Sequence, residues 1–132
     1  MKILCITPIT DTMMENLLSK GEVSYYPNLK KKQIRDLLTL KKYDVIFTNP
    51  NKQNFMLDED LLDGSNISII CTASTGLNHI DLDYCKKNSI KTLSITKDYV
   101  ILDKITSTAE HSFGLMMALI RNIPKSFGSV KK

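Results

Sequence analysis

Short runs of β-forming, largely apolar residues alternate with segments of helical spacing along most of this chain, and this rhythm constrains the fold more than any other feature. Five such runs occur, at 3–7, 23–26, 44–47, 67–71 and 91–95. Strands that alternate with helices predict a parallel sheet covered by helices on both faces. We therefore expect an α/β fold with a flavodoxin-like, doubly wound sheet of five parallel strands.

The segments between the runs carry the boundary signals of helices. Thr10 or Asp11 can cap the first helix, and the segment 30–41 has apolar side chains at helical spacing. Asp58 and Asp81 are placed to cap two further helices. Helices in these places would provide the crossovers that parallel strands require.

The final part of the chain departs from this rhythm. Thr106–Ile120 is helical in character, and from Phe113 onward it is apolar on nearly every side. A helix that is hydrophobic all round requires burial all round, and one small sheet covers only one side. We expect this helix to pack on a second domain or another chain, with a central helix wrapped by its own domain as the alternative. Arg121, Asn122 and Pro124 are expected to end it.

Composition and charge argue against several classes of protein. The 132 residues fit one domain of ordinary soluble composition, 42% hydrophobic and 24% charged, with a mild formal net charge of +4. Short lysine runs without interleaved aromatic residues are typical of a solvated surface, so no nucleic-acid partner is expected. No apolar stretch is long enough for a membrane span, and the N-terminal run is too short for a signal peptide. We therefore expect a cytoplasmic protein without a membrane partner.

The three cysteines are Cys5, Cys71 and Cys85. Their number is odd and no spacing suits a metal, so we interpret them as small core residues in a reducing compartment. No cluster of metal ligands is visible in the sequence, and no metal site is predicted.

The loop after the fourth predicted strand is the most informative candidate site, because ligands of open α/β sheets bind beyond the carboxyl ends of the strands. Ser74, Thr75, Gly76 and Leu77 combine hydroxyl groups with a glycine that allows close approach of the backbone to a ligand. Successive backbone N–H groups in such a turn form an anion-binding nest, for which a carboxylate is the natural guest. The same residues also suit a tight strand-to-helix turn without a ligand, and both interpretations stay open at this point.

Other classes of enzyme fail on particular residues. The chain has no G-x-G-x-x-G and no G-x-x-x-x-G-K-[ST], so it contains no complete dinucleotide or P-loop site. A response-regulator receiver needs acidic residues after the first and third strands. Those places hold Thr7-Pro8 and Thr48-Asn49 instead.

Neither histidine is predicted to be catalytic. His79 is interpreted as a partly exposed residue at the start of a helix. His111 follows Glu110, and neighbours in a helix point in different directions, so the two do not form a dyad.

Two segments resemble the D-isomer-specific 2-hydroxy-acid dehydrogenase family, to which phosphoglycerate, glycerate, formate and D-lactate dehydrogenases belong. Ser74–Asp81, followed by Asn88–Lys91, is similar to the segment after the fourth strand of that family's substrate domain. Thr106–Pro124 resembles the long helix that leaves the substrate domain and packs on the nucleotide domain. The resemblance covers essentially the whole chain. It implies a substrate domain at 1–104, and an interdomain helix with the start of a nucleotide-binding domain at 105–132.

The resemblance implies hydride transfer between a D-2-hydroxy acid and NAD in the complete enzyme. The loop Ser74–Leu77 would offer backbone N–H groups to the substrate carboxylate, and Asn51, in the loop 49–53, would face the cleft. Thr108 would lie near the nicotinamide end of the cofactor. The family's catalytic Arg, Glu and His and its glycine-rich NAD loop have no counterpart here, so no catalytic residue is assigned. We expect neither tight NAD binding nor turnover by this chain alone.

Two hypotheses about function remain. The chain is either a fragment of such a dehydrogenase or a non-catalytic binding module that holds a small carboxylic acid or pairs with a full-length relative. In both cases we expect a homo-oligomer, or association through the helix Thr106–Ile120.

Overall fold

The computed structural model describes residues 1–50 and 54–130. The chain divides into two compact units, Met1–Lys97 and Asp98–Lys132, which we call the N-terminal unit and the C-terminal unit. The predicted assignment of 1–104 and 105–132 to two functional domains stays a prediction.

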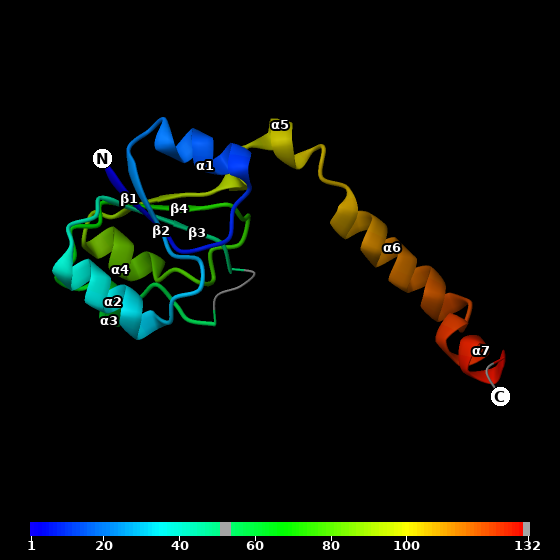
Figure 1. The fold of residues 1–132 in the computed structure, drawn as a ribbon. Coiled ribbons are helices and arrows are strands. Elements are labelled where there is room, and N and C mark those ends of the chain that lie inside the picture. The colour runs from blue at the N-terminus through cyan, green and yellow to red at the C-terminus, as the bar shows by residue number, and fades with distance from the viewer. Residues whose placement is uncertain (51–53, 131–132) are drawn as a thin grey trace. The chain divides into compact units, whose positions relative to one another are not determined.

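The N-terminal unit is built on one parallel sheet (Figure 1). Its strands are β1 (Lys2–Cys5), β2 (Glu22–Tyr25), β3 (Val45–Thr48), β4 (Ile69–Thr72) and β5 (Lys91–Leu93). Their order across the sheet is β2-β1-β3-β4-β5, and every neighbouring pair is parallel. This is the flavodoxin-like order, so the predicted fold class is confirmed.

Four helices cross between these strands, and each lies where the sequence predicts a helix. They are α1 (Asp11–Leu18), α2 (Lys31–Leu40), α3 (Glu59–Leu62) and α4 (Leu82–Lys87). The side chains of Thr10, Asp58 and Asp81 accept hydrogen bonds from backbone N–H groups in the first turns of α1, α3 and α4. In Figure 1, α1 lies on one side of the sheet and α2, α3 and α4 lie on the other.

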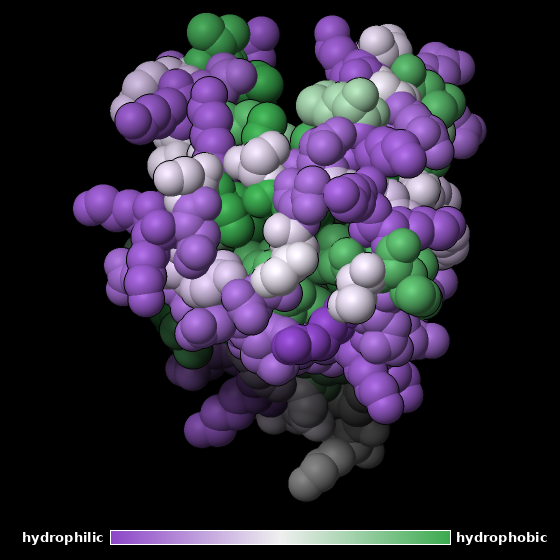
Figure 2. Space-filling view, turned by 90° about the vertical axis from the view of Figure 1, so that its left-hand side faces the viewer, coloured by the Kyte–Doolittle hydropathy of each residue, from purple (hydrophilic) through white to green (hydrophobic). Residues whose placement is uncertain are grey.

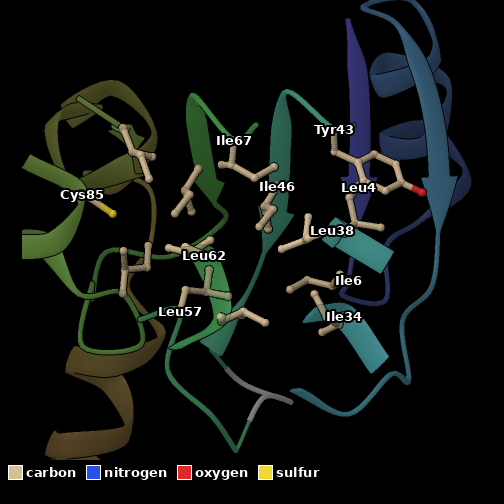
Figure 3. Packing of buried hydrophobic residues seen from close by; sticks show 14 residues of the cluster. Leu4, Ile6, Ile34, Leu38, Tyr43, Ile46, Leu57, Leu62, Ile67 and Cys85 are labelled. Atoms are coloured by element: carbon tan, nitrogen blue, oxygen red, sulfur yellow. The ribbon is translucent and has the colours of Figure 1, made fainter. Parts of the chain in front are cut away.

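The core lies between the sheet and α2, α3 and α4. Leu4, Ile46 and Ile70 come from three adjacent strands and are completely buried. Figure 3 shows side chains from strands and helices pointing into the same space, with Ile34 and Leu38 of α2 among them. Full burial of such side chains contributes about 1.5–3 kcal/mol each. The sheet and its loop positions are thus held by ordinary hydrophobic packing.

One predicted strand is too long. The run 91–95 was expected to be extended throughout, but β5 ends at Leu93 and a 3₁₀ turn, Ile95–Lys97, follows it. The backbone N–H of Ile95 and the hydroxyl of Thr96 bond to the loop after β4 instead of continuing the sheet. This difference brings the end of the unit against the candidate site.

The C-terminal unit consists of helices only. They are α5 (Tyr99–Leu102), α6 (Ser107–Ile120) and α7 (Ile123–Val130). Helix α6 agrees with the predicted helix to within one residue, whereas α5 was not predicted. Asn122 adopts a positive φ of 52° between α6 and α7, and Pro124 lies in the first turn of α7. Helix α6 ends at Ile120 with Arg121 as its C-cap, as expected, whereas Pro124 lies in the next helix, because proline is suited to a helix start.

No residue from 98 to 130 is buried. Phe113, Leu119 and Ile120 of α6 are 61%, 74% and 65% exposed. Over the described ranges, no helix combines the length and apolar character that crossing a bilayer requires.

Candidate functional site

Three buried threonines mark the carboxyl ends of adjacent strands. Thr48 and Thr72 are the last residues of β3 and β4, and Thr7 follows β1 by two residues. Their exposed fractions are 0%, 4% and 4%. Thr48 and Thr72 are also partners in the sheet register. Buried hydroxyl groups require hydrogen bonds, so we expect polar groups to be paired with one another at this edge of the sheet.

The loop Ser74–Leu77 follows directly, and all four of its carbonyl groups are bound within the N-terminal unit. The Ser74 oxygen accepts from the Ile95 N–H at 3.4 Å, and the Thr75 oxygen accepts from Thr96 Oγ1 at 2.8 Å. The Gly76 oxygen accepts from Ser74 Oγ at 2.8 Å, and the Leu77 oxygen accepts from the Ile80 N–H at 2.9 Å.

The backbone N–H groups of the same loop behave in the opposite way. Those of Ser74, Thr75, Gly76 and Leu77 have no acceptor within 1–50 and 54–130. In a planar trans peptide, a carbonyl and the next N–H point in opposite directions. Each carbonyl held by the protein therefore fixes the following N–H away from that bond. The N–H groups of Thr75, Gly76 and Leu77 are oriented in this way and have no acceptor in the described part of the chain, which suits an anion.

Gly76 keeps the space beside this loop open. Its φ is not positive, and a side-chain carbon placed on it would meet no atom within 4 Å. Neither backbone strain nor crowding within the described chain therefore explains a glycine here. Its position agrees with the predicted close approach of a ligand to the backbone.

His79 is buried, with 8% of its surface exposed, so the expectation of a partly exposed residue is wrong. Its Nε2 lies 3.0 Å from Thr72 Oγ1, and Thr72 Oγ1 lies 2.8 Å from Ser74 Oγ. Nδ1 is buried and has no hydrogen-bond partner. Burial lowers the pKa of His79, which favours the neutral ring. No periodic pattern in the sequence indicates this contact, because the contact depends on how the loop 73–78 turns back.

A pocket of about 330 Å³ lies beside the loop, and its lining includes Asn54, Met56, Asn78 and His79. Asn51, predicted to face the cleft, lies outside the described residues. A second pocket, of about 430 Å³, is lined by residues at the amino ends of the strands, Lys2, Glu22 and Tyr43 among them. That end of the sheet is opposite to the one at which open α/β folds bind ligands.

Figure 2 views the side on which the N-terminus lies. Hydrophilic residues cover most of that face, and the hydrophobic ones lie mainly in the hollows between them. This face is an ordinary solvated surface. We place the candidate site at the loop Ser74–Leu77, because its backbone N–H groups have no acceptor in the described residues.

Thr108 lies in the first turn of α6, in the C-terminal unit, where its carbonyl accepts from Ser112 Oγ at 2.8 Å. Its predicted contact with a nicotinamide stays a prediction. The neighbouring Glu110 accepts from Thr106 Oγ1 at 2.7 Å. Across the described residues, no group of His, Cys, Asp and Glu side chains could hold a metal ion.

Residues 3–114 match the model of the D-isomer specific 2-hydroxyacid dehydrogenase catalytic domain. The chain belongs to this family. The predicted family is thereby confirmed, and the candidate loop lies inside the matched region.

Individual relatives agree with this assignment. D-3-phosphoglycerate dehydrogenase from Archaeoglobus fulgidus is 26% identical over 134 residues, which cover 100% of this chain and 24% of the relative. Human glyoxylate reductase/hydroxypyruvate reductase is 35% identical over 77 residues, 57% of this chain and 22% of the relative. The chain thus spans about a quarter of the length of these curated relatives.

Solved structures share the fold. The crystal structure of D-lactate dehydrogenase from Aquifex aeolicus, complexed with NAD and lactic acid, superposes with a TM-score of 0.73 and 25% identity. The superposition covers 100% of this chain and 37% of that one.

Proposed function

We propose that this chain is the substrate-side part of an oxidoreductase that acts on the CH–OH group of D-2-hydroxy acids, and that the loop Ser74–Leu77 binds the substrate carboxylate. One observation carries the proposal. All four carbonyl groups of the loop are bound by the protein, whereas its four N–H groups have no acceptor in the described part of the chain. A loop arranged in this way offers donors only, so it accepts a carboxylate and disfavours a cation.

We propose NAD as the cofactor of the complete protein, and a cytoplasmic location for it. A nicotinamide would supply the hydride acceptor for oxidation of the alcohol. In this chain only Thr108 is a candidate contact, and the sequence has no glycine-rich dinucleotide loop. These residues do not make up a dinucleotide site. Neither tight NAD binding nor turnover is therefore proposed for the 132 residues alone.

A non-catalytic binding module is the second candidate function. Carboxylate binding by this loop needs no residue outside 74–77 and the bonds that hold it, all of which lie in the N-terminal unit. The same chain could therefore hold a small carboxylic acid without any chemistry, or do so while paired with a full-length relative. The loop is shared by both candidates, and only a turnover measurement separates them.

The test of carboxylate binding is a nitrogen-15 NMR titration of the chain with pyruvate, with neutral pyruvamide as the matched ligand. We expect the amide signals of Ser74–Leu77 to move with pyruvate. The expected dissociation constant is about 1 mM, because this corresponds to a binding free energy of about 4 kcal/mol, which two or three charged hydrogen bonds can supply. Pyruvamide should bind at least about tenfold more weakly. Equal binding of the two ligands, or shifts confined to other residues, would refute the proposal.

Gly76→Val supplies the control for place. A side-chain carbon at this position meets no atom of the described residues within 4 Å, and the valine methyl groups would occupy the space beside the donors, so the fold should persist while pyruvate binding is lost. Addition of NADH then separates the two functions. Oxidation of NADH by pyruvate above a no-protein control would show that the chain is catalytic by itself, contrary to our expectation.

A further inference from the structure

Three hydrogen bonds, through the side chains of Thr72 and Ser74, link the buried His79 to the exposed Gly76. His79 Nε2 is 3.0 Å from Thr72 Oγ1, Thr72 Oγ1 is 2.8 Å from Ser74 Oγ, and Ser74 Oγ is 2.8 Å from the Gly76 oxygen. Thr72 and His79 are both more than nine-tenths buried, whereas Gly76 is exposed. The chain of hydrogen bonds thus leads from the interior of the N-terminal unit to the proposed carboxylate loop.

The number of available protons determines which group donates in each of these three hydrogen bonds. A carbonyl oxygen only accepts, so Ser74 must donate its single hydroxyl proton to Gly76. Thr72 must then donate to Ser74, which uses the only proton of Thr72. His79 Nε2 must therefore carry a proton and donate it to Thr72. The other neutral tautomer, with the proton on Nδ1, would break one of the three bonds.

The hydrogen bond from Ser74 to the Gly76 carbonyl determines the direction of the Leu77 N–H, one of the groups that would bind the ligand. The Gly76 carbonyl and the Leu77 N–H belong to one trans peptide unit, so holding the carbonyl toward Ser74 turns the Leu77 N–H the opposite way. Without that bond, no hydrogen bond within the described residues holds the orientation of the peptide between Gly76 and Leu77. The Ser74 and Thr75 carbonyls are held from the segment after β5, and the Leu77 carbonyl accepts from the Ile80 N–H, so none of these three bonds involves the His79 side chain.

We propose that His79 is a positioning residue, which acts through Thr72 and Ser74 to hold the Gly76–Leu77 peptide so that its N–H faces the carboxylate. This inference rests on the proposed function of the loop. It explains why an imidazole is buried at this place with Nδ1 unpartnered: Nε2–H is committed to Thr72, which leaves Nδ1 as an acceptor without a donor. An unsatisfied buried acceptor is costly, so its presence calls for such a compensating role.

The first test is the tautomer of His79, measured by nitrogen-15 NMR of the unliganded chain at neutral pH. We expect Nε2 to show the shift of a protonated ring nitrogen and Nδ1 that of an unprotonated one. A proton on Nδ1 alone would overturn the proposal. This measurement uses no ligand, so it stands even if pyruvate does not bind and the proposed function fails.

The second test compares Thr72→Val with Thr72→Ser. Valine has the shape of threonine but cannot relay the proton, whereas serine keeps the hydroxyl group. We expect Thr72→Val to shift the Leu77 amide signal in the free chain and to weaken pyruvate binding at least about tenfold, as for loss of one charged hydrogen bond. Thr72→Ser should restore both. Equal Leu77 signals and equal affinities in the two variants would overturn the proposal.

The third test is rescue at His79 itself. The amide nitrogen of glutamine can take the place of Nε2 as a donor, and leucine cannot. His79→Gln should therefore keep pyruvate binding within a fewfold of wild type, while His79→Leu should lose it to the same extent as Thr72→Val. If His79→Leu does not fold, the two Thr72 variants still decide the question. Equal loss in the glutamine and leucine variants would show a packing role only.

Discussion

In the N-terminal unit, Leu4, Ile46 and Ile70 are completely buried, whereas Phe113 and Leu119 of the C-terminal unit are 61% and 74% exposed. Both units are rich in apolar residues. In the first, strands and helices of complementary period face each other, so that each apolar face covers another. In the second, α6 is apolar on nearly all sides and the unit holds nothing large enough to cover it. Burial therefore depends on the layers available, not on the hydrophobicity of a segment.

Alanine substitutions in the two units give the most direct test of this difference in burial. Ile46→Ala should lower the free energy of unfolding by about 2–5 kcal/mol, because it leaves a cavity in the centre of the sheet. Leu119→Ala should change it by less than about 0.5 kcal/mol, because the side chain is exposed. Urea unfolding at a protein concentration too low for self-association, followed by circular dichroism, measures both. A similar loss in the two variants would mean that Leu119 is buried within the single chain.

Self-association through α6 is a second test of this difference in burial, with a somewhat smaller expected effect. Exposed apolar patches of this kind rarely stay uncovered, so we expect the chain to self-associate through α6. Phe113→Ser with Leu119→Ser should raise the dissociation constant at least about tenfold, since burial of one such side chain contributes about 1.5–3 kcal/mol. Sedimentation equilibrium gives the constant. A wild-type chain that stays monomeric at millimolar concentration would contradict this expectation.

The smallest expected effect concerns the two histidines, one in each unit. Burial lowers the pKa of His79 in the folded state below its ordinary value of 6.5, so the unfolded chain takes up this proton first as the pH falls. The unfolded state then binds more protons, and the free energy of unfolding should decrease below about pH 6.5 until folded His79 is also protonated.

Urea unfolding between about pH 7 and pH 5.5 measures this contribution, within the range where histidine titrates. His79→Gln should flatten the dependence, because glutamine does not titrate. His111→Gln, on exposed α6, is the matched control and should keep it. An unchanged slope in His79→Gln would mean that another group is responsible.

The strands, three of the helix caps and the candidate loop could be predicted from the sequence, because each depends on local patterns. The run 67–71 and the caps Asp58 and Asp81 are examples: the capping side chains bond to N–H groups three residues away. Predictions failed where one residue type serves two purposes. Pro124, expected to help end α6, lies in the first turn of α7, and Ile95, expected in the fifth strand, begins a 3₁₀ turn and donates its N–H to the loop.

By itself the sequence determined the parallel α/β fold and the family, and it predicted the candidate loop Ser74–Leu77, since all three follow from the order of residues along the chain. Only the tertiary structure decided which groups of that loop are free. The bonds from Ile95 and Thr96 join residues about twenty positions apart, and the burial of His79 beside Thr72 depends on the turn between them. Hydrogen bonds between distant groups depend on their positions in space, and residue type alone does not show which donor reaches which acceptor.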